Sequence, residues 1–107
     1  MIIVTEKILY EQLGIGRTRE LTGEIILTYR EALTAINFIL NEGSFVILGG
    51  DVLSTNDEYI YAFWNYEIDL SLSPVENTHS SCEKALAYIL SLKNKEMCNY
   101  ILVLDSR

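Results

Sequence analysis

Hydrophobic side chains return every three or four residues between Tyr29 and Leu40, the spacing that places them on one face of a helix. Thr28 and Glu31 stand at the start of this stretch as a capping box, and Gly43 stands after it as a stop signal. We therefore expect a helix here, with a buried stripe of Tyr29, Ala32, Leu33, Ile36, Ile39 and Leu40.

A second main helix is predicted from a second capping box, formed by Ser80 and Glu83, to about Lys93. Its buried stripe contains Cys82, Ala85, Leu86, Ile89 and Leu92. Residues 71–79, which include the single proline, Pro74, are expected to form a loop before it. A short helix is predicted near the N-terminus, capped by Thr5 and ended by Gly14.

Strands are predicted where apolar residues run together or alternate with polar ones. Residues 24–27 are short and branched, and residues 45–48 and 100–104 are apolar on both faces, as in covered strands. Gly49, Gly50 and Asp51 follow residues 45–48, where two glycines permit a bulge or the approach of another backbone. Residues 15–23 are polar and are expected to form a loop.

The strict alternation from Glu58 to Leu70 predicts a long strand, joined to the preceding one by a turn at residues 54–57. The face predicted to point to the core carries Ile60, Ala62, Trp64, Tyr66, Ile68 and Leu70. The opposite face carries Tyr59, Tyr61, Phe63, Asn65, Glu67 and Asp69, which makes it aromatic at one end and acidic at the other.

These elements predict an α+β fold in one domain spanning residues 1–107. We expect a mixed sheet of about four strands that includes a central hairpin, with two main helices packed on it and a short N-terminal helix. A chain of 107 residues buries one core without a large internal cavity, so any site is expected on the surface or in a shallow groove.

Charge is the strongest functional signal in the sequence. The net charge is −7, and between Arg30 and Lys84 there are nine acids and no lysine or arginine. Such a field repels nucleic acid and attracts cationic partners, although acidity that serves only solubility is an alternative explanation. The sequence lacks a membrane-spanning apolar run, and its N-terminus has the wrong charge order for a secretory signal, so a cytoplasmic protein is expected.

Few residues suit catalysis or metal binding, and neither a catalytic residue, a metal site nor a cofactor is predicted. His79 and Cys82 form a conceivable catalytic pair, but Cys82 belongs to a predicted buried stripe. The same two residues with Cys98 lack the paired spacing of zinc ligands. Cys82 and Cys98 are expected to be reduced thiols and not a disulfide.

Several segments together resemble a family of small bacterial immunity proteins from polymorphic toxin systems. The resemblance covers about residues 24–104, and its most specific element is the Gly-Gly-Asp after a strand between two helices. It is carried by residues 29–33, 46–52 and 81–89 and by Trp64. It implies an antitoxin without enzymatic activity that binds and neutralises a cognate toxin, often a nuclease. No resemblance is found for residues 1–23.

The acidic stretch agrees with this implication, because a nuclease must bind phosphates with a basic surface that an acidic protein can occupy. We expect the toxin to bind an aromatic and acidic surface around the hairpin, made of Asp51, Asp57, Glu58, Tyr59, Tyr61, Phe63, Glu67 and Asp69. The alternatives are a regulatory or adaptor domain that binds a peptide or small ligand in the groove beside the second hairpin strand, and a small enzyme that uses His79 and Cys82.

Overall fold

The computed structural model describes residues 5–19 and 22–106, and for residues 5–8, 61–64 and 106 it describes the backbone alone. In chain order the elements are α1 (Thr5–Leu13), β1 (Arg17–Thr18), β2 (Ile25–Thr28), α2 (Tyr29–Glu42), β3 (Phe45–Leu53), β4 (Tyr59–Asn65), α3 (Pro74–Leu90), the 3₁₀ turn η1 (Lys95–Met97) and β5 (Asn99–Ser106).

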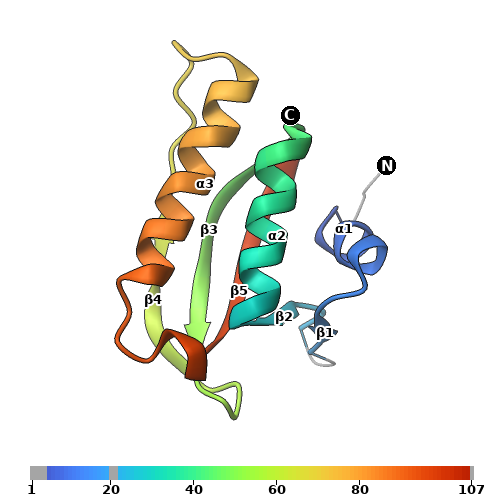
Figure 1. Ribbon diagram of the computed structural model, residues 1–107, viewed down its shortest axis with the longest axis vertical. Coiled ribbons are helices and arrows are strands. Elements are labelled where there is room, and N and C mark those ends of the chain that lie inside the picture. The colour runs from blue at the N-terminus through green and yellow to red at the C-terminus, as the bar shows by residue number, and fades with distance from the viewer. Residues whose placement is uncertain (1–4, 20–21, 107) are drawn as a thin grey trace.

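The described strands form one sheet in the order β1-β2-β5-β3-β4, and their pairings are antiparallel. Helices α2 and α3 lie across one face of this sheet, while α1 lies beyond α2 (Figure 1). The predicted α+β class is confirmed. The sheet differs from the expected mixed sheet of about four strands in having five antiparallel strands, because β1 joins it. The hairpin of β3 and β4 also lies at one end of the sheet, since β5 inserts between β2 and β3.

Helix α2 has the predicted boundaries. The Thr28 hydroxyl accepts a hydrogen bond from the Glu31 amide at 3.2 Å, and the Glu31 carboxylate accepts one from the Thr28 amide at 3.0 Å. Gly43 ends the helix in the left-handed conformation, with φ at 82°, and donates its amide to Ile39 O at 3.0 Å. Both end signals that the sequence predicted are therefore confirmed.

The main core lies between the helices and the sheet. It contains buried residues of α2, α3 and the strands, including Ala32, Ile36, Ile39, Ile47, Val52, Cys82, Ala85, Ile89, Tyr100 and Leu102. A separate small cluster of Ile26, Leu53 and Ile101 is buried on the sheet face opposite the helices. The predicted N-terminal helix is confirmed as α1, which contributes Leu9 and Tyr10 to the main core.

The segment predicted as a loop at residues 15–23 contains strand β1, which pairs Arg17 with Ile26 and Thr18 with Ile25. Two residues are too few to give a periodic signal, so the strand was missed. Gly16 precedes it at φ +85°, and a Cβ atom there would lie 2.6 Å from the Ile25 side chain. The glycine is therefore required by both the backbone and the close approach to β2.

Gly49 and Gly50 lie inside β3 and do not end it. The pairing with β5 shifts register between Ile47 and Gly49, and the pairing with β4 shifts between Gly50 and Val52. The predicted bulge is thus confirmed, while the predicted end of the strand at Gly49-Gly50-Asp51 is wrong. The strand continues because β5 pairs with it from Phe45 to Leu53.

Strand β4 ends at Asn65, five residues before the predicted end at Leu70. Tyr66 still donates its amide to Leu48 O at 2.8 Å, and the chain then leaves the sheet. Leu70, which the alternation placed toward the core, is 94% exposed. The pattern was misleading because residues 66–70 follow the strand without continuing it, and the backbone of Asp69 is bonded to the side chain of Asn77.

Helix α3 begins at Pro74, so the prediction of a loop at residues 71–79 and a helix start at Ser80 was wrong. The working capping box is Ser73 with Glu76, with hydrogen bonds of 3.2 and 2.8 Å, and Pro74 follows Ser73 at a first-turn position that tolerates proline. The helix ends at Leu90, before the predicted Lys93. Leu86, assigned to the buried stripe, is exposed.

Two buried hydroxyls of α3 explain why its first half carries no apolar stripe. Ser81 accepts a hydrogen bond from the Ile47 amide at 3.0 Å, and Thr78 donates to Phe45 O at 2.6 Å. These β3 residues lie before Gly49, the point where the pairing with β4 begins. The two hydroxyls therefore provide hydrogen-bond partners for backbone groups of β3 that β4 does not reach. Such partners are needed because buried backbone groups are normally hydrogen-bonded.

Candidate functional site

The predicted partner surface is divided by the structure between two ends of the molecule. The turn between β3 and β4 lies at one end of the long axis, and the loop between β4 and α3 lies at the other (Figure 1). Asp57, Glu58 and Tyr59 belong to the first end, whereas Glu67 and Asp69 belong to the second. Strand β4 separates them by about 20 Å, given a rise of ~3.3 Å per residue.

Asp57 is engaged by the protein's own arginines. Arg17 donates both guanidinium hydrogen bonds to its carboxylate, at 2.6 and 2.5 Å, and Asn99 donates a third at 2.9 Å. Arg19 donates to the Asp57 carbonyl oxygen at 2.5 Å. These contacts join the segment around β1 to the hairpin turn. Asp57 therefore holds these two parts of the chain together.

The hydrogen bond from Arg17 is the main reason that the pKa of Asp57 is lowered, with a further contribution from Asn99. The pKa of Asp51 is instead raised, mainly by burial and then by the nearby Glu24 carboxylate, while Arg19 opposes the shift. Asp51 pairs with Ile101 on the sheet face opposite the helices and is half-buried. Neither aspartate therefore offers a freely exposed charge to a partner.

Replacing Asp57 by asparagine is expected to lower the free energy of unfolding by about 0.5–1 kcal/mol at pH 7, the upper range for a partly exposed ion pair. Because the pKa of Asp57 is lowered in the folded protein, its contribution is present above the unfolded pKa of about 4 and is lost as the pH falls through the folded value. Urea denaturation of both proteins at pH 7 and pH 3 measures this. Equal stability at pH 7 would show that the contacts contribute nothing.

The remaining residues at the hairpin are exposed or lie outside the described side chains. Glu58 and Tyr59 are exposed next to a turn in which Ser54 accepts hydrogen bonds from the amides of Asn56 and Glu58, each at 3.1 Å. The side chains of Tyr61 and Phe63, together with the predicted packing of Trp64, fall outside the residues whose side chains are described.

At the other end, Asn77 holds the loop between β4 and α3 in place. Its side chain is 3% exposed and makes four hydrogen bonds. It accepts from the Tyr66 hydroxyl at 2.7 Å and from the Asp69 amide at 2.8 Å, and it donates to the carbonyl oxygens of Asp69 and Ser73 at 2.9 and 3.3 Å. The loop is consequently fixed to the first turn of the helix.

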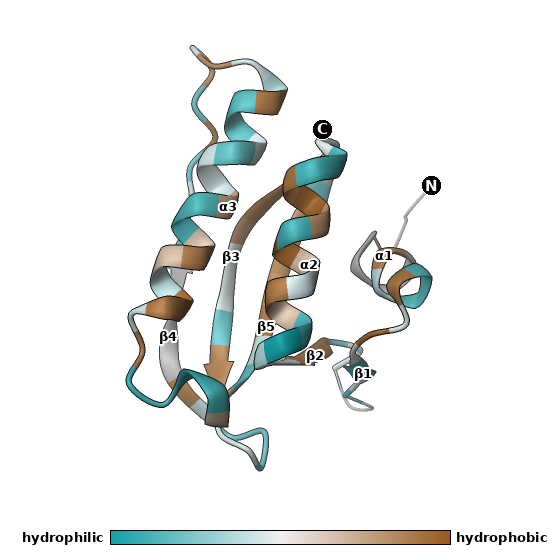
Figure 2. Cartoon of the chain, in the orientation of Figure 1, coloured by the Kyte–Doolittle hydropathy of each residue, from teal (hydrophilic) through white to brown (hydrophobic). Residues whose placement is uncertain are grey.

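This loop presents acidic and apolar side chains together. We call Glu67, Asp69, Leu70, Leu72, Val75 and Glu76 the loop surface. Leu70 is 94% exposed and Val75 is 55% exposed. A shallow groove of about 350 Å³ adjoins it, lined by Leu72, Val75, Glu76, His79 and Ser80. Figure 2 shows the loop as hydrophobic segments between hydrophilic ones.

The apolar members of the loop surface were missed by the sequence analysis. Leu70 was assigned to a core face because the alternation of β4 continues past the point where the strand ends. Ser73, Pro74 and Glu76 form the signal that could have found the correct boundary, since proline is favoured in the first turn of a helix. A helix starting at Pro74 leaves Leu70 and Leu72 in a short exposed connection.

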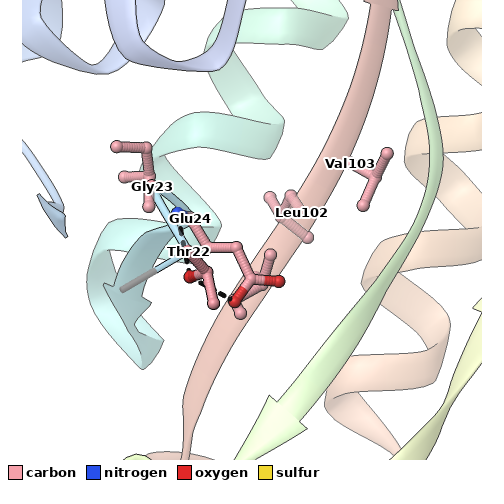
Figure 3. A pocket seen from close by; sticks show the side chains of 7 residues that line it. Thr22, Gly23, Glu24, Leu102 and Val103 are labelled. Atoms are coloured by element: carbon pink, nitrogen blue, oxygen red, sulfur yellow. Dashed lines mark hydrogen bonds between the residues drawn. The ribbon is translucent and has the colours of Figure 1, made fainter. Parts of the chain in front are cut away.

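A second groove of about 210 Å³ lies where β2 and β5 separate beyond their pairing at Leu27 and Tyr100. It is lined by Thr22, Gly23, Glu24, Ile25, Ile101, Leu102 and Val103 (Figure 3). The Thr22 hydroxyl donates a hydrogen bond to the Glu24 carboxylate at 2.8 Å. This carboxylate therefore already has a partner within the protein. The groove is smaller than the roughly 300–1,000 Å³ typical of small-molecule sites.

His79 and Cys82 do not have the arrangement of a catalytic pair. His79 lies within α3 and is exposed, not before its N-terminus as predicted. Cys82 is 2% exposed, and burial raises the pKa of its thiol to about 11. A thiol held protonated at neutral pH is a poor nucleophile. Cys82 and Cys98 are both free and buried, which confirms the expected thiols.

Across residues 5–19 and 22–106, no three His, Cys, Asp or Glu side chains are grouped so that they could hold a metal ion. Among the helices of the same residues, none is long and apolar enough to cross a membrane.

A family model described as immunity protein 40 matches residues 11–104. The match includes the region for which the sequence analysis found a resemblance and extends it toward the N-terminus by 13 residues, so that it also contains β1 and the end of α1. No curated protein and no solved structure matches the chain.

Proposed function

Because the chain belongs to the immunity protein 40 family, whose members protect against a toxin, we propose that it neutralises its cognate toxin by binding and covering a surface that the toxin needs. The proposal requires no chemistry by the protein itself. It is consistent with the burial of Cys82, because the raised pKa of its thiol makes it a poor nucleophile.

The observation that carries this proposal is the uncompensated acidity of the loop surface. Within the described part of the chain, Asp57 and Glu24 form ion pairs with arginines, whereas Glu67, Asp69 and Glu76 form none. Lys84 lies further along α3, and its ammonium group donates a hydrogen bond to the Asn65 carbonyl oxygen and not to one of these acids. Glu67 and Asp69 on the loop and Glu76 in the first turn of α3 are therefore exposed acids without an ion pair in the described chain, which suits a cationic partner.

A basic toxin is the partner that this charge favours, and a nuclease is the leading candidate. A nuclease needs lysine and arginine side chains to bind phosphates, so its substrate surface is positive. An acidic protein that covers this surface competes directly with the nucleic acid. Opposite charges also speed the encounter of the two proteins.

The adaptor alternative expected a groove beside the second hairpin strand, whereas the groove that could take an extended ligand lies between β2 and β5. It is small, and Glu24 within it is already bonded to Thr22. The loop surface is therefore the better supported interaction site.

Co-expression with the toxin encoded by the neighbouring gene tests the proposed function. Cells that produce the toxin should grow when this protein is also produced, and the two proteins should be purified together as a complex. Protection without a complex would favour an indirect or enzymatic mode of action. Failure to protect would contradict the proposal for that toxin.

A further inference from the structure

We propose that Leu70 is the apolar anchor of toxin binding, inserted into a pocket of a basic toxin surface, with Val75 beside it and Glu67, Asp69 and Glu76 as its charged rim. The inference rests on the proposed function and specifies which residues perform it. It moves the centre of the interface from the hairpin to the loop surface, because Asp57 at the hairpin turn is bonded to Arg17 and Asp51 is half-buried.

The exposure of Leu70 is the first reason. Scattered exposed apolar residues are ordinary, and Tyr59, Leu90 and Met97 are examples in this protein. Leu70, at 94%, is more exposed than any of these, and Leu72 and Val75 follow it closely in the chain. A leucine held almost entirely in water is available to a partner without any rearrangement of the core.

The second reason is that the loop is preorganised. Asp69 accepts hydrogen bonds from both the amide and the hydroxyl of Ser71, at 2.9 and 2.6 Å, and its carbonyl oxygen accepts one from the Leu72 amide at 3.0 Å. These bonds surround Leu70, and Asn77 anchors the same segment to α3. Little conformational freedom is lost when such a loop binds, which favours affinity.

The negative charge of the loop surface determines which kind of partner it can bind. A second copy of this chain would bring its own acids against Glu67, Asp69 and Glu76, and like charges across an interface are unfavourable. A nucleic acid or an anionic membrane surface would be repelled for the same reason. A basic protein surface with an apolar pocket satisfies both parts of the loop surface, since aromatic or aliphatic anchors inside a polar rim are typical of binding sites.

The test compares Leu70→Ala with Met97→Ala in binding to the purified cognate toxin. Met97 is 65% exposed on η1, outside the loop surface, so its replacement removes a similar apolar side chain elsewhere. We expect Leu70→Ala to weaken binding about tenfold or more, mainly through faster dissociation, and Met97→Ala to change it less than twofold. Thermal unfolding of the free proteins should be unchanged in both variants, because both side chains are exposed.

The outcomes separate this inference from the proposed function. If the wild type binds the toxin and Leu70→Ala binds equally well, the anchor is wrong and the proposed function stands. The anchor is also wrong if both variants lose the same affinity, or if sedimentation shows a dimer that depends on Leu70. If the wild type does not bind its toxin, the proposed function and the anchor both fail.

Discussion

Reversing Glu67 and Asp69 to lysine is expected to slow association with the cognate toxin tenfold or more at low salt. Both side chains are exposed on the loop surface, and steering by opposite charge acts mainly on the association rate. Raising the salt should narrow the difference, because exposed charges are screened over about 10 Å at 0.1 M. Rapid mixing of the toxin with each protein at two salt concentrations measures the effect.

A matched control separates a local effect from a change in total charge. Reversing Glu11 and Glu96 to lysine raises the net charge by the same amount, and these residues lie on α1 and η1, where both are exposed. This variant should associate with the toxin much faster than the loop variant. Equal association rates for the two variants would show that the interface lies elsewhere, or that only the total charge of the protein affects association.

Replacing Ser81 by alanine is expected to lower the free energy of unfolding by about 1–3 kcal/mol, the cost of leaving a buried donor unsatisfied. The Ile47 amide donates to the Ser81 hydroxyl, and Ser81 is fully buried. Thr78→Val should have a similar effect, since it removes the donor to Phe45 O without changing the size of the side chain. Urea denaturation monitored by circular dichroism gives both values.

Ser80 supplies the control for this prediction. It is the neighbour of Ser81 on α3 and is partly exposed, so Ser80→Ala should change stability by no more than about 0.5 kcal/mol. If Ser81→Ala and Ser80→Ala are equally stable, the hydroxyls of α3 do not take the place of a neighbouring strand along β3. The association of Ser81→Ala with the toxin should remain normal at temperatures where the variant is folded.

Elements with local signals could be predicted from the sequence. Helix α2 has a complete capping box at Thr28 and Glu31 and a glycine at its end, and all of these signals are satisfied by contacts between near neighbours. The strands β3 and β5 could be predicted because apolar side chains are buried on both of their faces. The glycines Gly49 and Gly50 indicated either a bulge or the approach of another backbone, and the structure shows register shifts next to them in both pairings of β3.

Features that depend on distant contacts could not be predicted. The start of α3 was missed because Asn77, Thr78 and Ser81 are polar and yet buried, and their partners lie up to 35 residues away in the chain. Hydrophobic periodicity cannot recognise a polar side chain that faces the core to satisfy a strand edge. The predicted strand β4 was too long, and Leu70 was placed inside, because the alternation of apolar residues continues past the end of the strand at Asn65.

The candidate site could be predicted only in part, because the sequence does not reveal the ion pairs of the folded protein. The sequence shows where acids are numerous, but it does not show which of them are paired. Asp57 lies 40 residues from Arg17 in the chain, and only the folded sheet brings them together. The acids of the loop surface differ from Asp57 because no arginine of the described chain reaches them.

We propose that this immunity protein acts by binding its toxin in fixed proportion and not by catalysis. The most direct measurement is a titration of the purified cognate toxin's activity with this protein, at toxin concentrations well above the dissociation constant. We predict a linear loss of activity that reaches its end at one equivalent, with full activity recovered when the complex is separated under denaturing conditions and the toxin is refolded. Complete inactivation by a small fraction of an equivalent, or a lasting change in the toxin's mass, would contradict the account.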